Sequence, residues 1–387
     1  MFNQHVTHRF LRELEGLESG ALHITTPDGR QHSFAGAKPG AIGQIEIHDW
    51  RTIPALVFRG DVGFAEAYRD GWFETDDLPN LMLAALQNGE AFDPVLENGH
   101  WLRWGERLYH LWNENTLRGS RRNIQAHYDL GNEFYQLWLD PTMTYSSALF
   151  QSDDDALEHA QANKYQRILN CLDAPSGDLL EIGCGWGGFA DHALSRGDYR
   201  IKGITLSDEQ HAYARSRLGQ RADIVLEDYR HQTGRYDALV SIEMFEAVGE
   251  KYWPTYFTKL RSLLKTKGRA VVQTITMSDR HFEAYRSGTD MIRRYIFPGG
   301  MLPSKSLFHD HAAQQGLRVN SQHAFGQDYA KTLSHWLDRF DAKTEEVKAL
   351  GFDDAFVRLW RYYLSACIAG FRSGRTDVVQ YELQPVS

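Results

Sequence analysis

The pattern of hydrophobic and polar positions divides the chain into two parts. The first part alternates apolar and polar side chains over residues 21–23 and 44–48, as short strands do. It then carries apolar residues at helical spacing in three further segments, 61–68, 78–87 and 101–113. No catalytic constellation stands out in this part, which is predicted to be a small N-terminal α+β domain of residues 1–117.

The second part repeats short apolar strands and helices from about residue 178 onward. Strands are predicted at 179–182, 201–205, 224–226, 238–242 and 269–274. Helices are predicted at 187–195, 208–218, 253–264, 332–350 and 353–371. Repeated strand–helix units form a parallel sheet covered on both faces, and ligands bind at the carboxyl ends of its strands. Residues 118–387 are therefore predicted to fold as a doubly wound α/β domain.

Composition narrows the function classes and the compartment. The 387 residues carry a net charge of −9, which argues against a nucleic-acid binder, since neutralising phosphates needs a basic surface. The three cysteines have neither metal nor disulfide spacing and the N-terminal histidines are scattered, so no metal site is predicted. No stretch approaches the roughly 20 apolar residues of a membrane span, and the first residues lack the apolar core of a signal peptide. We expect a cytoplasmic protein with peripheral membrane contact.

The strongest motif is Glu181-Ile-Gly183-Cys-Gly185-Trp-Gly187-Gly188, which follows a predicted strand and precedes a predicted helix. Glycines in this context let the backbone approach a nucleotide closely. Glu181 would repel a pyrophosphate but attract the ammonium group of S-adenosylmethionine. The next strand ends in Thr205-Leu206-Ser207, without the carboxylate that a dinucleotide site uses for its ribose. The motif therefore predicts S-adenosylmethionine as the cofactor.

Two further segments lie where the rest of this cofactor would bind. Ser207-Asp-Glu-Gln210 has the form of a capping box, so Gln210 can close a helix N-terminus, reach the ribose hydroxyls, or do both. Glu227-Asp228-Tyr229 follows the third strand, on the adenine side. A solvated acidic loop is the alternative interpretation of that segment.

An ordered set of short motifs resembles the cyclopropane fatty acid synthase family, which also includes the mycolic acid methyltransferases. Besides the glycine motif, the set comprises His127-Tyr-Asp-Leu-Gly-Asn132, Met143-Thr-Tyr-Ser-Ser147, Gly203-Ile-Thr-Leu-Ser207, Met244-Phe-Glu246, Tyr295-Ile-Phe-Pro298 with Leu302-Pro-Ser304, and Asp328-Tyr-Ala-Lys-Thr-Leu333. The resemblance covers roughly residues 122–372. Residues 60–72 also resemble the N-terminal domain of the two-domain bacterial phospholipid enzymes, which favours a phospholipid over a mycolic acid substrate.

The resemblance implies a class I S-adenosylmethionine methyltransferase fold and a set of site residues. The cofactor-binding residues that it and the glycine motif imply are Tyr145, Ser146, Glu181, Gly183, Gly185, Gly187, Thr205, Leu206, Gln210, Asp228 and Tyr229. It places Glu246, Tyr329 and the backbone of Ile275 around an active-site bicarbonate ion, and His127 near the cofactor. A cysteine and a histidine that hold the ion in the family are Ser147 and Gln273 here.

These two departures bear on the product. The alkene takes the sulfonium methyl group, a carbocation forms on the neighbouring carbon, and a base then removes a proton. Removal from the added methyl group closes a cyclopropane ring, whereas removal from the chain gives a methyl-branched alkene. Ser147 keeps the backbone N–H, but Gln273 cannot carry charge. The expected reaction is cyclopropane formation on cis double bonds of phospholipid acyl chains, with methyl branching as the alternative.

The expected partner is unsaturated phospholipid at the inner face of a membrane, which the protein contacts peripherally. The N-terminal domain is expected to serve membrane docking or dimer contact, which leaves a homodimer open. A lipid-binding protein with an inactive site and a methyltransferase for small molecules are the competing hypotheses.

Overall fold

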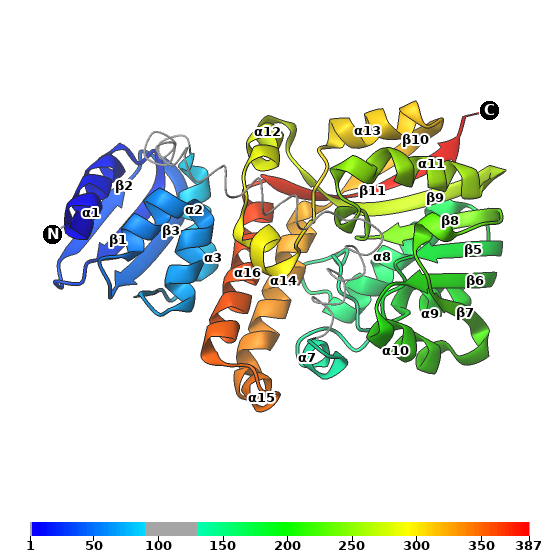
Figure 1. Cartoon of the computed structure of the whole chain (residues 1–387), viewed down its shortest axis with the longest axis horizontal. Coiled ribbons are helices and arrows are strands. Elements are labelled where there is room, and N and C mark those ends of the chain that lie inside the picture. The colour runs from blue at the N-terminus through cyan, green and yellow to red at the C-terminus, as the bar shows by residue number, and fades with distance from the viewer. Residues whose placement is uncertain (1, 90–129, 387) are drawn as a thin grey trace. The chain divides into compact units, whose positions relative to one another are not determined.

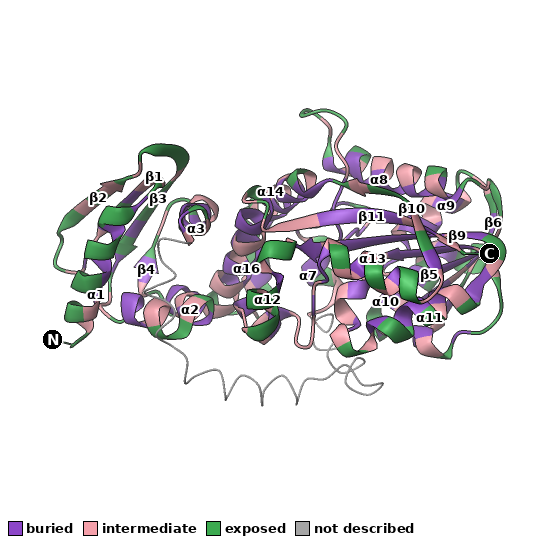
Figure 2. Ribbon diagram, turned by 90° about the horizontal axis from the view of Figure 1, so that it is seen from above, coloured by how far each residue is buried: buried purple, intermediate pink, exposed green. Residues whose placement is uncertain are grey.

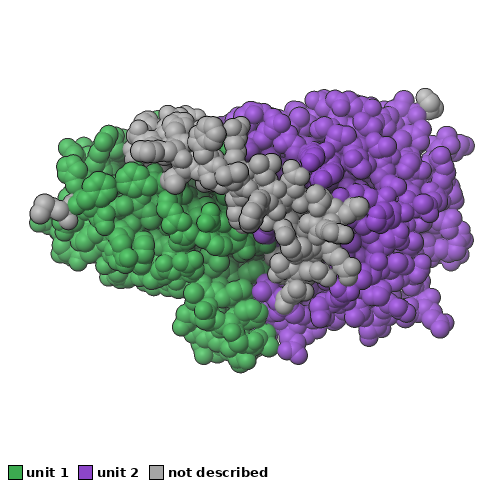
Figure 3. Space-filling model, viewed as in Figure 1, with its two compact units in different colours: residues 1–112, 287–296, 336–375 green, residues 113–286, 297–335, 376–387 purple. Residues whose placement is uncertain are grey.

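The computed structural model describes residues 2–89 and 130–386, which form two compact units (Figures 1 and 3). Unit 1 takes residues 1–112, 287–296 and 336–375, and unit 2 takes residues 113–286, 297–335 and 376–387. Three predictions lie outside the described residues: the helix at 101–113, the domain boundary after residue 117 and the site residue His127.

Unit 1 contains a four-stranded sheet in the order β2-β1-β3-β4. Its strands are β1 (Ser19–Thr25), β2 (Gln31–Ala35), β3 (Lys38–Ile47) and β4 (Phe73–Glu74). Its helices include α1 (Phe2–Glu13), α2 (Thr52–Arg69), α3 (Leu78–Gln87), α15 (Thr344–Ala349) and α16 (Asp354–Arg372). Helix α3 packs on β3 and against α16. The predicted strands lie within β1 and β3, and the predicted helix 78–87 is α3.

Two carboxylates of α2 bind segments from late in the chain. Asp61 accepts hydrogen bonds from the Met291 N–H at 2.8 Å and from the Tyr362 hydroxyl at 2.6 Å. Glu66 accepts a hydrogen bond of 2.6 Å from Tyr295, which lies in the π-helix Ile292–Ile296. The motif at residues 60–72 thus holds together stretches of unit 1 that are far apart in sequence.

Unit 2 is built on a seven-stranded sheet in the order β10-β11-β9-β8-β5-β6-β7. Five strands run parallel: β5 (Ser176–Ile182), β6 (Asp198–Thr205), β7 (Ala222–Leu226), β8 (Tyr236–Ile242) and β9 (Leu264–Met277). The sequence pattern predicted these five but missed the antiparallel pair β10 (Leu317–Ala324) and β11 (Thr376–Pro385) at one edge. The strand order reverses between β5 and β8, which is where such sheets bind ligands.

Helices cover both faces of this sheet and give it two cores (Figures 1 and 2). Leu179 joins the core with α8 (Leu157–Leu172), α9 (Gly188–Leu194) and α10 (Asp208–Leu218), whereas Leu180 joins the core with α11 (Trp253–Leu263) and α13 (Lys305–Gln314). This alternation follows from the two-residue period of a strand. The remaining helices are α7 (Asn132–Gln136), α12 (Asp279–Ser287) and α14 (Gly326–Ala342). The predicted helix 332–350 is therefore divided between α14 and α15.

No helix among residues 2–89 and 130–386 is long and apolar enough to span a bilayer.

Candidate active site

The glycine motif forms the turn between β5 and α9. Gly183 and Gly185 have φ values of 82° and 52°, a region that side chains with a Cβ rarely adopt. A Cβ at Gly183 would also lie 2.9 Å from the Met244 side chain. The backbone therefore needs glycine here, and it leads directly into the N-terminus of α9, as expected for a nucleotide-binding turn.

Glu181 lies at the end of β5 with an unused oxygen. Its side chain is buried, and Oε2 has no hydrogen-bond partner among the described residues. Burial raises the pKa of Glu181 well above its usual range, and the charge of Lys164 opposes this rise. A buried carboxylate without a donor is costly unless a cation meets it. The residue present thus fits the ammonium group of S-adenosylmethionine.

Lys164 is a buried lysine that was not predicted as a site residue from the sequence. It lies on α8, and its Nζ donates a hydrogen bond of 2.7 Å to Ser146 Oγ. Burial lowers the pKa of Lys164 to about 7, an effect that the negative charges of Glu243 and Glu181 oppose. A lysine at this spacing on a helix looks like a surface residue in sequence, so no local signal identified it.

The residues predicted to contact the ribose and adenine lie at the ends of β6 and β7 and in the turns that follow. Ser207 Oγ accepts a hydrogen bond from the Gln210 N–H at 3.2 Å and so caps α10, but the Ser207 N–H donates to Thr205 Oγ1 at 3.2 Å and not to the Gln210 side chain. Gln210 Oε1 accepts a hydrogen bond of 2.9 Å from Thr205, and Leu206 lies in the same turn, partly exposed.

Asp228 is buried and pairs with Arg230 at 2.6 Å, so this carboxylate is not part of a solvated acidic loop. Tyr229 beside it is also buried.

Residues 145–147 link helix α8, which holds Ser146, to a second group of site residues, which Ser147 contacts. The Tyr145 ring lies edge-on to Trp138 at a centroid distance of 5.6 Å. Gln161 on α8 donates a hydrogen bond of 2.9 Å to the Ser146 carbonyl, so two side chains of α8 hold Ser146. This fixes the position of the next backbone N–H, that of Ser147.

That second group converges on Glu243, the main site residue that the sequence analysis missed. Glu243 Oε1 accepts hydrogen bonds from the Ser147 N–H at 2.9 Å and from Gln273 Nε2 at 2.7 Å. Its Oε2 accepts a hydrogen bond of 2.5 Å from the Tyr329 hydroxyl. Burial raises the pKa of Glu243, and the hydrogen bonds from Tyr329 and Ser147 oppose this rise.

The backbone at Glu243 is unusual as well. Its φ is 50°, one of only three positive values among non-glycine residues of the described chain. Such a conformation costs on the order of 1–3 kcal/mol and is found mostly at functional sites. The sequence offered one signal, an acidic residue placed directly after the apolar strand 238–242.

Glu246 and Ile275 form a separate pair beside this cluster. Glu246 Oε1 accepts hydrogen bonds from the Ile275 N–H at 2.5 Å and from Thr274 Oγ1 at 3.0 Å. Its Oε2 is buried without a hydrogen-bond partner among the described residues. Burial, together with the negative charge of Glu243, raises the pKa of Glu246 to about 8. At neutral pH Glu246 is therefore mostly protonated.

Burial thus raises the pKa of both carboxyl groups, but Glu243 accepts three hydrogen bonds whereas Glu246 Oε2 has no partner among the described residues. Two titratable groups whose surroundings differ in this way commonly divide the roles of base and acid. The predicted residues Ser147, Gln273 and Tyr329 meet at Glu243, whereas Ile275 meets Glu246. His127 lies outside the described residues, but Asn132, at the end of the same motif, accepts a hydrogen bond of 2.6 Å from Trp186 in the glycine turn.

Comparison with known proteins identifies the family of the chain. The family model for mycolic acid cyclopropane synthetase matches residues 115–381. The chain is 38% identical over 378 residues to a tuberculostearic acid methyltransferase of Mycobacterium tuberculosis, which covers 94% of this chain and 87% of that protein. It is 35% identical over 348 residues to the cyclopropane-fatty-acyl-phospholipid synthase of Escherichia coli K12, which covers 86% of this chain and 85% of that one.

A solved structure shares the same fold. The mycolic acid cyclopropane synthase CmaA1, complexed with SAH and CTAB, matches with a TM-score of 0.64 and 32% identity, over 68% of this chain and 98% of that chain. The doubly wound sheet of unit 2 is thus the class I S-adenosylmethionine methyltransferase fold.

Proposed function

The chain belongs to the mycolic acid cyclopropane synthetase family of S-adenosylmethionine-dependent methyltransferases, and we propose that Glu243 is its catalytic base. The proposed reaction adds a one-carbon unit to the cis double bond of an unsaturated phospholipid acyl chain. The observation that carries the proposal is the Glu243 carboxylate, which accepts hydrogen bonds from Ser147, Gln273 and Tyr329.

The family resemblance assigns a bicarbonate ion to these same three residues, together with Glu246 and the Ile275 N–H. Here the three groups donate to Glu243, and the Ile275 N–H donates to Glu246. The residues present therefore do not fit a bicarbonate ion in addition to Glu243. We assign the ion's role to the side chain and route no step through bicarbonate.

The chemistry of the site then follows from this chain's residues. S-adenosylmethionine supplies an electrophilic methyl group when bound. The alkene electron pair forms the new carbon–carbon bond as the bond from sulfur to methyl breaks, and the neighbouring chain carbon becomes positively charged. Glu243 takes a proton from the cationic chain, and the electrons of that C–H bond neutralise the cation. Glu246 remains protonated, so that it does not place a second negative charge beside the base.

The proposed product is a methyl-branched, unsaturated acyl chain without ring closure. The Glu243 carboxylate is attached to the chain directly after β8 and held by three hydrogen bonds, whereas a bound ion can be placed differently, and base position selects the proton that is removed. The relative named as a tuberculostearic acid methyltransferase supports this choice over 94% of the chain. Cyclopropane formation is the second candidate, supported by the relative named as a phospholipid cyclopropane synthase.

The phospholipid substrate is supported by the same Escherichia coli relative, whose match covers 86% of the chain. We further propose that residues 1–117 form a domain that docks the enzyme on the inner face of the membrane or mediates a dimer. Activity on vesicles that is lost when this domain is removed, with cofactor affinity retained, would support the docking role. Loss of cofactor binding in the truncated chain would contradict it.

One experiment tests the product. Purified protein is incubated with vesicles of monounsaturated phospholipid and S-adenosylmethionine that carries a trideuterated methyl group. The released fatty esters are examined by mass spectrometry and NMR. Alkene signals with three retained deuterium atoms support the proposal. Ring methylene signals with two retained deuterium atoms would establish the cyclopropane product instead.

A further inference from the structure

We infer that Gln380 and Arg167 are positioning residues that orient the Gln273 amide toward Glu243 and favour the ionised form of this base. The inference rests on the proposed function of Glu243. Its basis is an unbroken series of hydrogen bonds that begins on α8, crosses two strands of the sheet and ends at the carboxylate.

The contacts of this series are short and mostly buried. Arg167 Nη1 donates to Gln380 Oε1 at 2.6 Å, and Gln380 Nε2 donates to Gln273 Oε1 at 2.9 Å. Gln273 Nε2 then donates to Glu243 Oε1 at 2.7 Å. Gln273 and Gln380 are directly paired in the β9–β11 ladder, and both are buried. Neither amide therefore relies on water to satisfy its polar atoms.

The direction of every bond in the series is determined by its two ends. Arg167 has donors only, so Gln380 must present its oxygen to the guanidinium and its NH₂ group to Gln273. An ionised Glu243 has acceptors only, so Gln273 must present its NH₂ group there. A reversed Gln273 would place an amide oxygen against a carboxylate oxygen. The two ends thus enforce the same orientation of both amides.

This uniform direction has an electrostatic effect on the base. The two amide dipoles point their positive ends toward Glu243, and aligned hydrogen bonds polarise one another in a low-dielectric interior. The positive charge of Arg167 lies at the far end and adds to the same effect. The series accordingly stabilises the ionised carboxylate that accepts the proton.

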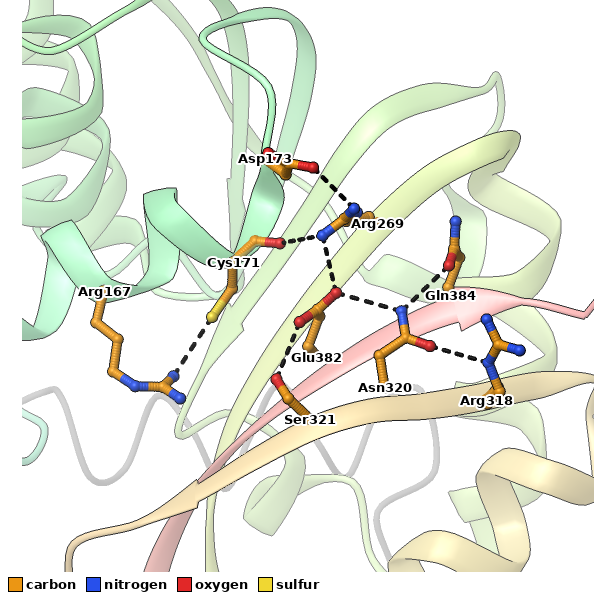
Figure 4. A network of polar contacts seen from close by, with 9 residues as sticks. All are labelled: Arg167, Cys171, Asp173, Arg269, Arg318, Asn320, Ser321, Glu382 and Gln384. Atoms are coloured by element: carbon orange, nitrogen blue, oxygen red, sulfur yellow. Dashed lines mark hydrogen bonds and ion pairs between the residues drawn. The ribbon is translucent and has the colours of Figure 1, made fainter.

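Other titratable and charged groups lie at both ends of the series. Lys164 on α8 and Glu246 interact electrostatically with Glu243, and Tyr329 on α14 donates to it. Arg167 interacts electrostatically with Cys171 on the same helix and with His323 on β10. Cys171 also interacts with Glu382 on β11 and Arg269 on β9, and His323 with Asp377 on β11. Figure 4 shows Arg167 next to Cys171, whose Sγ lies 3.5 Å from Nη1, and Arg269 next to Glu382.

The test uses Gln380→Glu and Gln380→Met, with Gln384→Leu as a matched control. Glutamate keeps an acceptor for Arg167 but, when ionised, cannot donate to Gln273, and methionine removes both bonds at similar volume. Gln384 lies on the same strand and contacts Asn320 at 3.1 Å, outside the series (Figure 4). The measurements are kcat on vesicles between pH 5 and 9, cofactor affinity by calorimetry, and thermal unfolding.

We expect Gln380→Glu and Gln380→Met to lower kcat roughly 2- to 10-fold, because the hydrogen bond that both variants remove joins two neutral amides. The acid limb of the pH profile should move to higher pH, because a less stabilised carboxylate binds its proton more tightly. Cofactor affinity should stay within about twofold. In a Gln273→Leu background both substitutions should have little further effect, since the link to Glu243 is already absent.

Two outcomes would overturn the inference: an unchanged pH profile in both folded variants, or an equal loss of kcat with and without Gln273. Failure of the proposed function has a different result, namely a Glu243→Gln variant that keeps normal turnover. If Glu243→Gln is inactive while both Gln380 variants retain wild-type kcat and pH profile, only the positioning role is wrong.

Discussion

Glu181 and Glu243 end neighbouring strands of the same sheet, yet the protein treats their oxygens in opposite ways. Glu181 is one of the four residues of β5 that pair with β8, and one of its buried oxygens has no partner among the described residues. Glu243 follows β8, and both of its oxygens accept hydrogen bonds. Lys164 interacts electrostatically with both carboxylates.

The difference indicates that Glu181 suits a cationic ligand and that Glu243 suits a proton. An unsatisfied buried carboxylate gains most from a ligand that brings its own positive charge, which suits the ammonium group of the cofactor. A carboxylate that accepts three hydrogen bonds is held in one place, and these bonds favour its ionised form against the effect of burial, which suits a base that must accept a proton. The cofactor side is therefore incomplete without its ligand, whereas the base side is assembled by the protein alone.

The largest expected effect comes from removing the base. Glu243→Gln cannot accept a proton, so turnover should fall about 10²- to 10⁴-fold, the range for general base catalysis. Cofactor affinity should be nearly unchanged, because Glu243 lies outside the glycine turn. Turnover on vesicles and calorimetric titration with S-adenosylmethionine measure the two quantities. Retained turnover would rule out Glu243 as the base.

Glu243→Gly is the informative companion variant. Glycine adopts a φ of 50° without strain, so the backbone should tolerate the change, and the donors of Ser147, Gln273 and Tyr329 would lose their acceptor. We expect added bicarbonate to restore part of the activity of this variant but not that of Glu243→Gln, whose side chain still fills the site. An absence of rescue would show that these donors alone cannot hold the ion.

A smaller effect is expected on the cofactor side. Glu181→Gln should weaken binding of S-adenosylmethionine roughly 10- to 100-fold, since a charge-assisted hydrogen bond contributes about 1.5–3 kcal/mol. The ratio of products should not change, because the base is untouched. Calorimetric titration measures the affinity, and Asp223→Asn, an exposed carboxylate on β7, serves as the control. An unchanged dissociation constant would place the ammonium group elsewhere.

The two sides also differ in how far the sequence predicted them. The cofactor side depends on local backbone requirements, such as glycines with positive φ and the capping of α10 by Ser207, and these leave recognisable motifs. The base side joins residues that are far apart in the chain, from Ser147 to Tyr329. The family resemblance named five of its members but not Glu243, because the resemblance assigned that volume to an ion.

Two features of the fold were not predicted from the sequence. Strands β10 and β11 form an antiparallel pair at the edge of the sheet; β10 is polar over residues 320–323, whereas β11 alternates apolar and polar side chains over residues 379–384, a strand signal that was not recognised. Lys164 is buried although lysine is rarely buried unless paired, and its partners come from other elements. Only the assembled sheet places Gln380 opposite Gln273.

The smallest expected effect concerns Glu246, which resembles Glu181 in having an unpartnered oxygen but lies on the base side. Its pKa of about 8 exceeds the ordinary value of 4.5, so between these values the folded state binds more protons than the unfolded state. Stability should therefore fall as the pH rises through this window. Glu246→Gln cannot titrate but keeps an acceptor for the Ile275 N–H, so its melting temperature should fall less between pH 6 and pH 9. We expect a difference of a few degrees by differential scanning calorimetry. Lys164 is present in both the wild type and Glu246→Gln, so the effect of its titration on stability largely cancels when the two are compared. If the melting temperatures of the two proteins change in parallel across this pH range, Glu246 is ionised in the folded protein, and the base region holds two negative charges.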